Sequence, residues 1–352
     1  MEREFFESRR QPIEISSANS IERRVLVSVV IPCMNEEQVL RETHRCITTV
    51  LEKGAINFEI VYVDDGSTDS TYNLLRELQA QDGRIRVVRL ARNFGHQVAI
   101  TAGLEHSSGD AVVIIDADLQ DPPEVILEFF AKWLDGYDVV YGVRIEREGE
   151  TQFKLWTAKF FYRCISRLSD TRIPLDTGDF RLMDRRAVDA LLSMPERDRF
   201  VRGMVSWLGF SQVAVPYRRA ARAAGSTKFS LFKMVRFALD GIFSFSILPL
   251  RIATWTGFAA SALAILGIVV VLLERFMEVP GLVKGWSSAV IAELFIGGVQ
   301  LICMGIIGEY VGRIYGEAKR RPLYIVRERM GFDTRNSVAA ATRRAMISSG
   351  KR

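Results

Sequence analysis

The sequence predicts a largely parallel α/β domain followed by two long apolar helices. Short apolar runs without polar alternation recur from residue 25 onwards, and stretches of helical periodicity separate them. This pattern is typical of strands that are buried on both faces of a parallel sheet. Further along the chain, 252–273 and 289–308 are apolar stretches long enough for a helix to cross a bilayer. We therefore expect two regions of different character.

The α/β domain is expected to span residues 25–222. Its first strand ends at Pro32, and Asp69 or Ser70 can cap its second helix. The predicted elements, in chain order, are strand 25–31, helix 36–51, strand 58–63, helix 70–81, strand 85–90 and strand 111–115. At least four buried strands therefore form the sheet, and helices cover both of its faces.

Composition limits the class of partner. The chain carries a formal net charge of +5, but Lys and Arg gather beside the apolar stretches and form no basic stripe with aromatics. A membrane surface is therefore a better partner than nucleic acid. The four cysteines show no CxxC spacing, which argues against a zinc site or disulfide framework and fits a reducing compartment. Residues 1–24 are a polar extension without the apolar segment of a signal peptide.

The C-terminal third predicts a two-helix transmembrane region over 251–316 and a basic tail over 317–352. The expected spans are 252–273 and 289–308. Basic residues flank the outer ends of the two spans, and the connecting loop has no net positive charge. The positive-inside rule then places both termini and the α/β domain in the cytoplasm. Two buried helices of a soluble domain are the alternative.

The segment 223–250 connects the two regions. Its apolar residues recur at helical spacing, with Lys and Arg among them, which predicts an amphipathic helix in the membrane interface. A core helix of the α/β domain is the alternative. We favour the interface because an apolar span follows so closely.

Polar clusters follow three of the predicted strands. They comprise residues 32–36, residues 64–69 and Asp116-Ala117-Asp118-Leu119-Gln120. Because ligands of open α/β sheets bind beyond the carboxyl ends of the strands, the three clusters are expected to meet at one crevice. Residues 116, 118 and 120 would share one side if their strand continued. Carboxylate and amide oxygens suit Mg²⁺ or Mn²⁺ bound together with substrate phosphates. Taken singly, each cluster has an alternative interpretation as a turn or helix cap.

The motifs in combination resemble a known enzyme family. No GxGxxG or GxxxxGK[ST] sequence is present, which argues against the usual dinucleotide and P-loop sites. The series PxxNE, VDDGSTD and DADLQDPP, each after a predicted strand, resembles family 2 glycosyltransferases with a GT-A fold, a Rossmann-like domain with a mostly parallel sheet. Residues 92–100 and the two spans resemble the polyprenyl-phosphate branch, which includes dolichol-phosphate mannose synthase and bactoprenol glucosyltransferases. The likeness covers about residues 25–330.

The resemblance implies roles for the residues at the strand ends. It implies a nucleotide-sugar pocket formed by Pro32, Glu36, Asp65 and Asp116. Asp118 and Gln120 would hold Mg²⁺ or Mn²⁺ on the diphosphate, and Asp118 would thereby be catalytic. Such a metal neutralises the charge that develops on the departing nucleoside diphosphate.

Basic side chains near the interfacial segment are candidates for holding a lipid phosphate. Arginine guanidinium groups match phosphate geometry, and lysine adds a point charge. The family resemblance implies this role for Arg202, Arg219, Arg222 and Lys228, and it implies that Arg144 lies near the donor diphosphate. The alternative is a polybasic patch that only attracts anionic lipid.

Asp179 is the remaining catalytic candidate. It matches a position where family members carry an acidic or polar residue near the acceptor. A general base is one interpretation, but a phosphate monoester has a second pKa of about 6 and is already ionised at neutral pH. Asp179 could instead orient arginine side chains or the metal shell, and a loop cap is a further interpretation.

Together these expectations describe a membrane-anchored, inverting glycosyltransferase on the cytoplasmic face of the inner membrane. The resemblance implies transfer of glucose from UDP-glucose onto a polyprenyl (undecaprenyl) phosphate, and self-association into a homo-oligomer. A different donor, such as GDP-mannose, is the first alternative. A processive polysaccharide synthase is the second, although the QxxRW sequence usual in such enzymes does not occur. A non-catalytic, nucleotide-sugar-binding membrane scaffold is the third.

Overall fold

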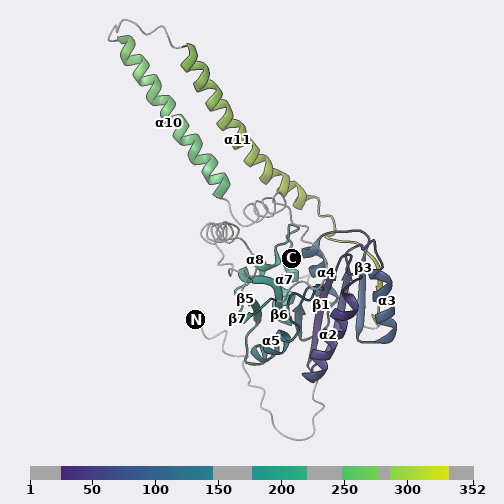
Figure 1. The fold of residues 1–352 in the computed structure, drawn as a ribbon. Coiled ribbons are helices and arrows are strands. Elements are labelled where there is room, and N and C mark those ends of the chain that lie inside the picture. The colour runs from purple at the N-terminus through teal and green to yellow at the C-terminus, as the bar shows by residue number, and fades with distance from the viewer. Residues whose placement is uncertain (1–24, 146–176, 220–247, 277–285, 333–352) are drawn as a thin grey trace, which may run out of the picture.

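The computed structural model describes residues 25–145, 177–219, 248–276 and 286–332. Figure 1 shows a sheet domain covered by helices, from which two long helices project side by side. The helices are α2 (Leu40–Lys53), α3 (Thr71–Gln81), α4 (His96–His106), α5 (Val125–Leu134), α7 (Arg185–Ser193), α8 (Val201–Trp207), α10 (Leu248–Phe276) and α11 (Trp286–Ala318). The strands are β1 (Leu26–Cys33), β2 (Asn57–Asp64), β3 (Ile85–Leu90), β4 (Ala111–Ile114), β5 (Val139–Arg144), β6 (Thr177–Asp184), β7 (Gln212–Tyr217) and β8 (Val326–Met330).

The described strands form one mixed sheet in the order β7-β5-β6-β4-β1-β2-β3-β8. Its centre is parallel, because β1 pairs in parallel with β2 and β4, and β2 pairs in parallel with β3. β6 runs antiparallel to both β4 and β5, whereas β5 and β7 are parallel. The expected α/β domain with a mostly parallel sheet is confirmed, and the antiparallel β6 is an addition to it.

Helices cover both faces of the sheet, which explains why the central strands lack polar alternation. One core contains residues of α2, α3 and α5, including Ile47, Leu75 and Phe129. The other core contains residues of α4, α7 and α8, including Ile100 and Leu191. Successive residues of a strand point to opposite faces, so β1 contributes to both cores. Burial of each large apolar side chain contributes about 1.5–3 kcal/mol to this packing.

Strand β8 lies in the segment that the sequence suggests is only a basic tail. It pairs antiparallel with β3 at the sheet edge, with Val88 opposite Arg329. Its sequence, Val-Arg-Glu-Arg-Met, has no apolar run, and a charged edge strand gives little periodic signal. Since β8 follows α11 closely, the chain beyond the long helix returns to the sheet domain.

The two long helices contain one candidate membrane span among the described residues. Phe295–Ala318 in α11 has a mean hydropathy of 1.5 over a membrane-length window, and Ile252–Leu263 in α10 is a shorter apolar helix. Both expected apolar stretches are helical, but the structure supports one span and leaves the two-span arrangement as a proposal. The far end of α11 contacts the sheet domain, where the Arg197 N–H donates to Glu317 Oε1 at 2.8 Å.

Gly103 allows α4 to lie directly against β1, and its replacement gives a first testable prediction. A Cβ atom at Gly103 would clash with the Val30 side chain and lie 3.2 Å from Val63 Cγ2. Gly103→Ala is therefore expected to lower the free energy of unfolding by about 1–3 kcal/mol, the usual cost of overpacking a core. Urea denaturation in matched detergent measures this change. Gly83→Ala is the control, since no atom lies within 4 Å of its Cβ position, and an equal loss in both variants would contradict the prediction.

Candidate functional site

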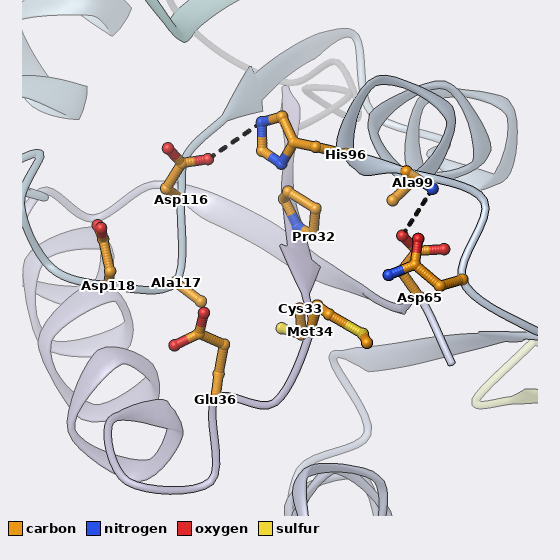
Figure 2. A pocket seen from close by; sticks show the side chains of 12 residues that line it. Pro32, Cys33, Met34, Glu36, Asp65, His96, Ala99, Asp116, Ala117 and Asp118 are labelled. Atoms are coloured by element: carbon orange, nitrogen blue, oxygen red, sulfur yellow. Dashed lines mark hydrogen bonds and ion pairs between the residues drawn. The ribbon is translucent and has the colours of Figure 1, made fainter. Parts of the chain in front are cut away.

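A cavity of about 330 Å³ opens at the carboxyl ends of β1, β2 and β4. Figure 2 shows acidic side chains entering it from different loops, with Glu36 on one side and Asp116 and Asp118 on a neighbouring loop. Its lining comprises Pro32, Cys33, Met34, Glu36, Asp65, Asn93, Gly95, His96, Ala99, Asp116, Ala117 and Asp118. The three predicted clusters therefore do meet at one crevice.

The loops after β1 and β2 are joined by hydrogen bonds that shape this crevice. Asn35 has a φ of 59°, which Asn tolerates better than most residues. Its N–H donates to Ser67 Oγ at 3.0 Å, and its Oδ1 accepts from the Thr68 N–H at 2.8 Å. At Gly66, whose φ is 73°, a Cβ atom would lie 2.7 Å from the Asn93 backbone nitrogen. Only glycine allows the loops after β2 and β3 to approach this closely.

Asp65 fixes the third loop. Its carboxylate accepts hydrogen bonds from the N–H groups of Phe94 at 2.7 Å and Gly95 at 2.9 Å. Burial raises the pKa of Asp65, and the two N–H donors oppose that effect. The side chain thus holds the loop that starts α4 against the cavity, and it lines the cavity itself.

The acidic turn after β4 does not continue the strand. β4 ends at Ile114, and Leu119 has a φ of 57°, an unusual conformation for a branched side chain. Asp118 Oδ1 accepts from the Gln120 N–H at 3.1 Å. Strand alternation therefore does not bring residues 116, 118 and 120 to one side. Asp116 and Asp118 line the cavity, whereas Gln120 is not among its lining residues.

Asp116 is the most perturbed carboxyl group of the turn. Its Oδ1 is buried and has no hydrogen-bond partner in the described part of the chain. Burial raises the pKa of Asp116 to about 6, His96 opposes this shift, and Asp179 reinforces it. His96 Nε2 lies 3.5 Å from that oxygen. A buried carboxylate oxygen that faces a cavity and accepts no hydrogen bond is suited to a cationic ligand.

Asp179 lies in β6 at the centre of a buried network. Its carboxylate accepts two hydrogen bonds from the Arg202 guanidinium, at 2.9 and 3.2 Å, and one from Gln97 Nε2 at 3.0 Å. His96 Nε2 is 3.3 Å from Asp179 Oδ2, so the imidazole bridges Asp179 and Asp116. Burial opposes ionisation of Asp179, but Arg202 and His96 hold its pKa well below the usual range. Asp179 is therefore an ionised anchor for Arg202.

A second charged cluster surrounds Asp121. Asp121 Oδ1 accepts from the Tyr217 hydroxyl at 2.5 Å, and that hydroxyl in turn accepts from Arg144 Nε at 3.2 Å. Arg219 Nε lies 3.8 Å from the same Asp121 oxygen. The ends of β5 and β7 are adjacent in the sheet, with Arg144 opposite Tyr217. This pairing brings Arg144 and Arg219 to one carboxylate.

Comparison with known proteins identifies the family. Residues 28–192 match the family model described as glycosyl transferase family 2. The chain is also 48% identical over 314 residues to an uncharacterized glycosyltransferase of Bacillus subtilis (strain 168), which covers 89% of this chain and 97% of that protein. The chain belongs to glycosyltransferase family 2.

Further relatives of this glycosyltransferase are similar over most of their length. It is 41% identical over 302 residues to the bactoprenol glucosyl transferase of Shigella phage SfV, covering 86% of this chain and 98% of that protein. Among solved structures it is similar to the glucosyl-3-phosphoglycerate synthase from Mycobacterium tuberculosis in complex with Mn²⁺, UDP and phosphoglyceric acid. That likeness has a TM-score of 0.44 at 22% identity and covers 62% of this chain and 78% of the other.

The carboxylates in the cavity of this glycosyltransferase fit a divalent metal whose remaining ligands would come from the substrate phosphates. No group of three or more His, Cys, Asp or Glu side chains suited to a metal occurs in the described residues. Asp116 and Asp118 nevertheless line one cavity, and the buried Asp116 Oδ1 lacks a hydrogen-bond partner among those residues. Mg²⁺ is commonly held by one or two carboxylates plus substrate phosphates, so two carboxylates without a full cage match that pattern.

The remaining sequence expectations divide into three groups. Pro32, Glu36 and Asp65 line the cavity as expected. Arg202 pairs with Asp179, and Arg222 and Lys228 lie outside the described residues, as do the N-terminal extension and most of the interfacial segment. Three residues that were not among the assigned site residues also lie in the site or its neighbouring cluster: His96, Asp121 and Tyr217. Two of them lie within recognised motifs, His96 in the 92–100 segment and Asp121 in DADLQDPP, and that membership is the signal that could have found them.

Proposed function

We propose that this glycosyltransferase is a membrane-anchored, inverting enzyme that transfers glucose from UDP-glucose onto a polyprenyl phosphate. The observation that carries the proposal is the 41% identity to a bactoprenol glucosyl transferase over 98% of that protein's length. A cavity at the sheet edge supports it, because nucleotide ligands of α/β sheets bind at the carboxyl ends of strands. A site with acidic lining can hold a cation, and a cation can in turn bind a diphosphate.

On the donor side, we assign the cavity to the nucleotide-sugar. Pro32, Glu36 and Asp65 would line the nucleoside pocket, and Asp116 would lie beside the diphosphate. Asp118, together with Asp116, would hold Mg²⁺ or Mn²⁺, whereas Gln120, the second ligand that the resemblance implied, is not among the residues that line the cavity. When bound, that metal supplies electrostatic stabilisation of the departing diphosphate.

On the acceptor side, a phosphate oxygen attacks the anomeric carbon from the face opposite the leaving group, which inverts the configuration. Arg202, Arg219, Arg222 and Lys228 are the proposed ligands of the lipid phosphate, and Arg144 the ligand of the donor diphosphate. The Asp179–Arg202 pair supports this role, since a guanidinium fixed by a buried carboxylate is preorganised for phosphate. Holding both substrates in line replaces a bimolecular encounter by a local reaction.

We further propose that both long helices span the inner membrane, with both termini in the cytoplasm and with self-association of the chain. The apolar segment Phe295–Ala318 supports one span directly. The contacts between the end of α11 and the 197–198 loop support a catalytic domain held close to the membrane surface. The phosphate headgroup of the lipid acceptor would then reach the cavity at the membrane surface.

The experiment that tests the function is sugar transfer into a lipid extract. Purified protein, a short polyprenyl phosphate and Mg²⁺ are incubated with a panel of radiolabelled UDP- and GDP-sugars. We expect label from UDP-glucose in the lipid phase, and we expect EDTA to lower that rate at least about a hundredfold because the metal contributes several kcal/mol. Added Mn²⁺ should restore it.

The pattern of labelling distinguishes the alternatives. Transfer from GDP-mannose alone would replace the donor assignment and keep the acceptor class. Polymer in place of a single-sugar lipid would point to a processive synthase. No labelled lipid from any donor, with folded and membrane-bound protein, would contradict the proposed reaction, and full activity in EDTA would contradict the metal assignment.

A further inference from the structure

Asp121 lies directly after the acidic turn but carries none of the roles proposed for that turn. It is only 1% exposed. Its Oδ1 accepts the Tyr217 hydroxyl hydrogen bond, while its Oδ2 is buried without a hydrogen-bond partner in the part of the chain that the structure describes. A buried carboxylate is costly unless cations or donors face it. Cationic neighbours are therefore needed to offset the free-energy cost of burying the Asp121 carboxylate.

Two guanidinium groups face Asp121, one from the end of β5 and one from the segment just after β7. Arg144 Nη2 lies 3.7 Å and Arg219 Nε lies 3.8 Å from Asp121 Oδ1. Both separations are longer than an N–H···O hydrogen bond, so charge attraction holds the arginines. Gly178 leaves room for one of them, since a Cβ atom there would lie 2.7 Å from Arg144 Nη2.

The charges in this cluster favour an anionic ligand. Two guanidinium groups close together repel each other, and a carboxylate between them offsets that repulsion. The cluster of Arg144, Arg219 and Asp121 still carries one net positive charge, and Tyr217 supplies a fixed hydroxyl that orients both Arg144 and the carboxylate. Arginine forks match the geometry of phosphate oxygens.

We propose that Asp121 is a positioning residue that holds Arg144 and Arg219 together as one binding site for a phosphate group. The inference rests on the proposed function, which brings two phosphate-bearing substrates to this enzyme. One shared site replaces the separate assignment of Arg144 to the donor and Arg219 to the acceptor, since the donor diphosphate and the acceptor monophosphate offer the same chemistry to a guanidinium pair. Asp121 itself does not contact the reacting atoms and acts through the two arginines.

Asp121→Asn tests the proposal, because the amide keeps an oxygen for the Tyr217 hydroxyl and removes the charge. The KM for UDP-glucose and the KM for a polyprenyl phosphate are measured separately, each at saturating concentration of the other substrate. We expect the KM of the substrate that the pair binds to rise about tenfold, the scale of losses when an orienting partner is removed. A rise for UDP-glucose identifies the diphosphate, and a rise for the lipid identifies the monophosphate.

A matched control separates positioning from general damage. Asp138→Asn also removes a carboxylate that pairs with arginine, since Asp138 Oδ1 lies 2.7 Å from Arg186. Asp138 directly precedes β5, whereas Arg144 is the last residue of that strand. Asp138 therefore lies at the other end of β5, and both KM values should stay at the wild-type level. Tyr217→Phe is the second test variant: it keeps the Asp121 charge but frees Asp121 and Arg144, and we expect a KM rise of about threefold.

Specific kinetic results would contradict the proposed role of Asp121. Folded Asp121→Asn with both KM values within about twofold of wild type contradicts it, as does a lower kcat with unchanged KM values. If Asp121→Asn does not fold, unchanged KM values in Tyr217→Phe contradict it. If the wild-type protein transfers no sugar, the proposed function fails separately, and calorimetric binding of UDP and of polyprenyl phosphate to the same variants decides on Asp121.

Discussion

Replacing Asp118 by asparagine is expected to lower kcat for sugar transfer about a thousandfold, equivalent to about 4 kcal/mol of transition-state stabilisation. Asp118 lines the cavity on the same turn as Asp116, whose buried Oδ1 lacks a hydrogen-bond partner among the described residues. An amide oxygen can still contact a cation but supplies no negative charge, so the variant is expected to bind Mg²⁺ or Mn²⁺ poorly. Initial rates with saturating UDP-glucose and lipid measure the effect.

Two comparisons make this result specific. Asp135→Asn removes an exposed carboxylate that pairs with Lys132 at 3.1 Å, and it is expected to keep wild-type kcat. Raised Mn²⁺ concentration should recover part of the Asp118→Asn rate, because weaker metal binding is compensated by mass action. A kcat within about threefold of wild type at every metal concentration would show that Asp118 does not hold the metal.

Local sequence patterns predicted the elements that bury apolar side chains on both faces. The predicted strand 85–90 coincides with β3, and the predicted helix 70–81 agrees with α3, because each has a clear apolar period and a polar boundary. β8 was missed, since Val326–Met330 carries three charged residues and pairs with a strand far away in the sequence. Edge strands of this kind depend on tertiary pairing, which no local pattern encodes.

The same distinction applies to the candidate site, where some features could be predicted from local sequence and others depend on tertiary contacts. Asp65 and Asp116 could be assigned to one crevice because parallel strands end at one sheet edge. The orientation of the acidic turn could not be predicted, because the unusual φ of Leu119 breaks strand alternation. The Asp179–Arg202 pair joins residues of β6 and α8, and the contact depends on how α8 packs on the sheet. Charge pairing across elements therefore has to be read from the structure.

Asp179→Asn is expected to lower kcat about a hundredfold and to reduce the free energy of unfolding by about 2 kcal/mol at pH 7. The buried carboxylate accepts two hydrogen bonds from Arg202 and lies 3.3 Å from His96 Nε2. Removing its charge leaves the Arg202 guanidinium without its buried counterion and releases the side chain from its fixed orientation. Steady-state kinetics and urea denaturation in detergent measure the two effects.

The stability difference has a defined pH dependence. Arg202 and His96 hold the folded-state pKa of Asp179 well below its unfolded value despite burial. Its contribution is therefore fully present above the unfolded pKa and is lost as the pH falls through the folded pKa. The difference between wild type and Asp179→Asn should shrink as the pH falls below about pH 4. A difference that grows in acid would contradict the lowered pKa.

The pH dependence of the rate decides whether Asp179 is a base or an orienting residue. A carboxylate with so low a pKa is a weak base, and the acceptor phosphate needs none, since its second pKa of about 6 leaves it ionised at neutral pH. We therefore expect kcat/KM for the lipid to fall below about pH 6 in wild type, with the same acidic limb in Asp179→Asn at a lower plateau. If Asp179 were the general base, the variant would lose that limb. An unchanged limb assigns the titration to a group other than Asp179, either the acceptor phosphate or Asp116, whose pKa is raised to about 6, and leaves Asp179 the task of fixing Arg202.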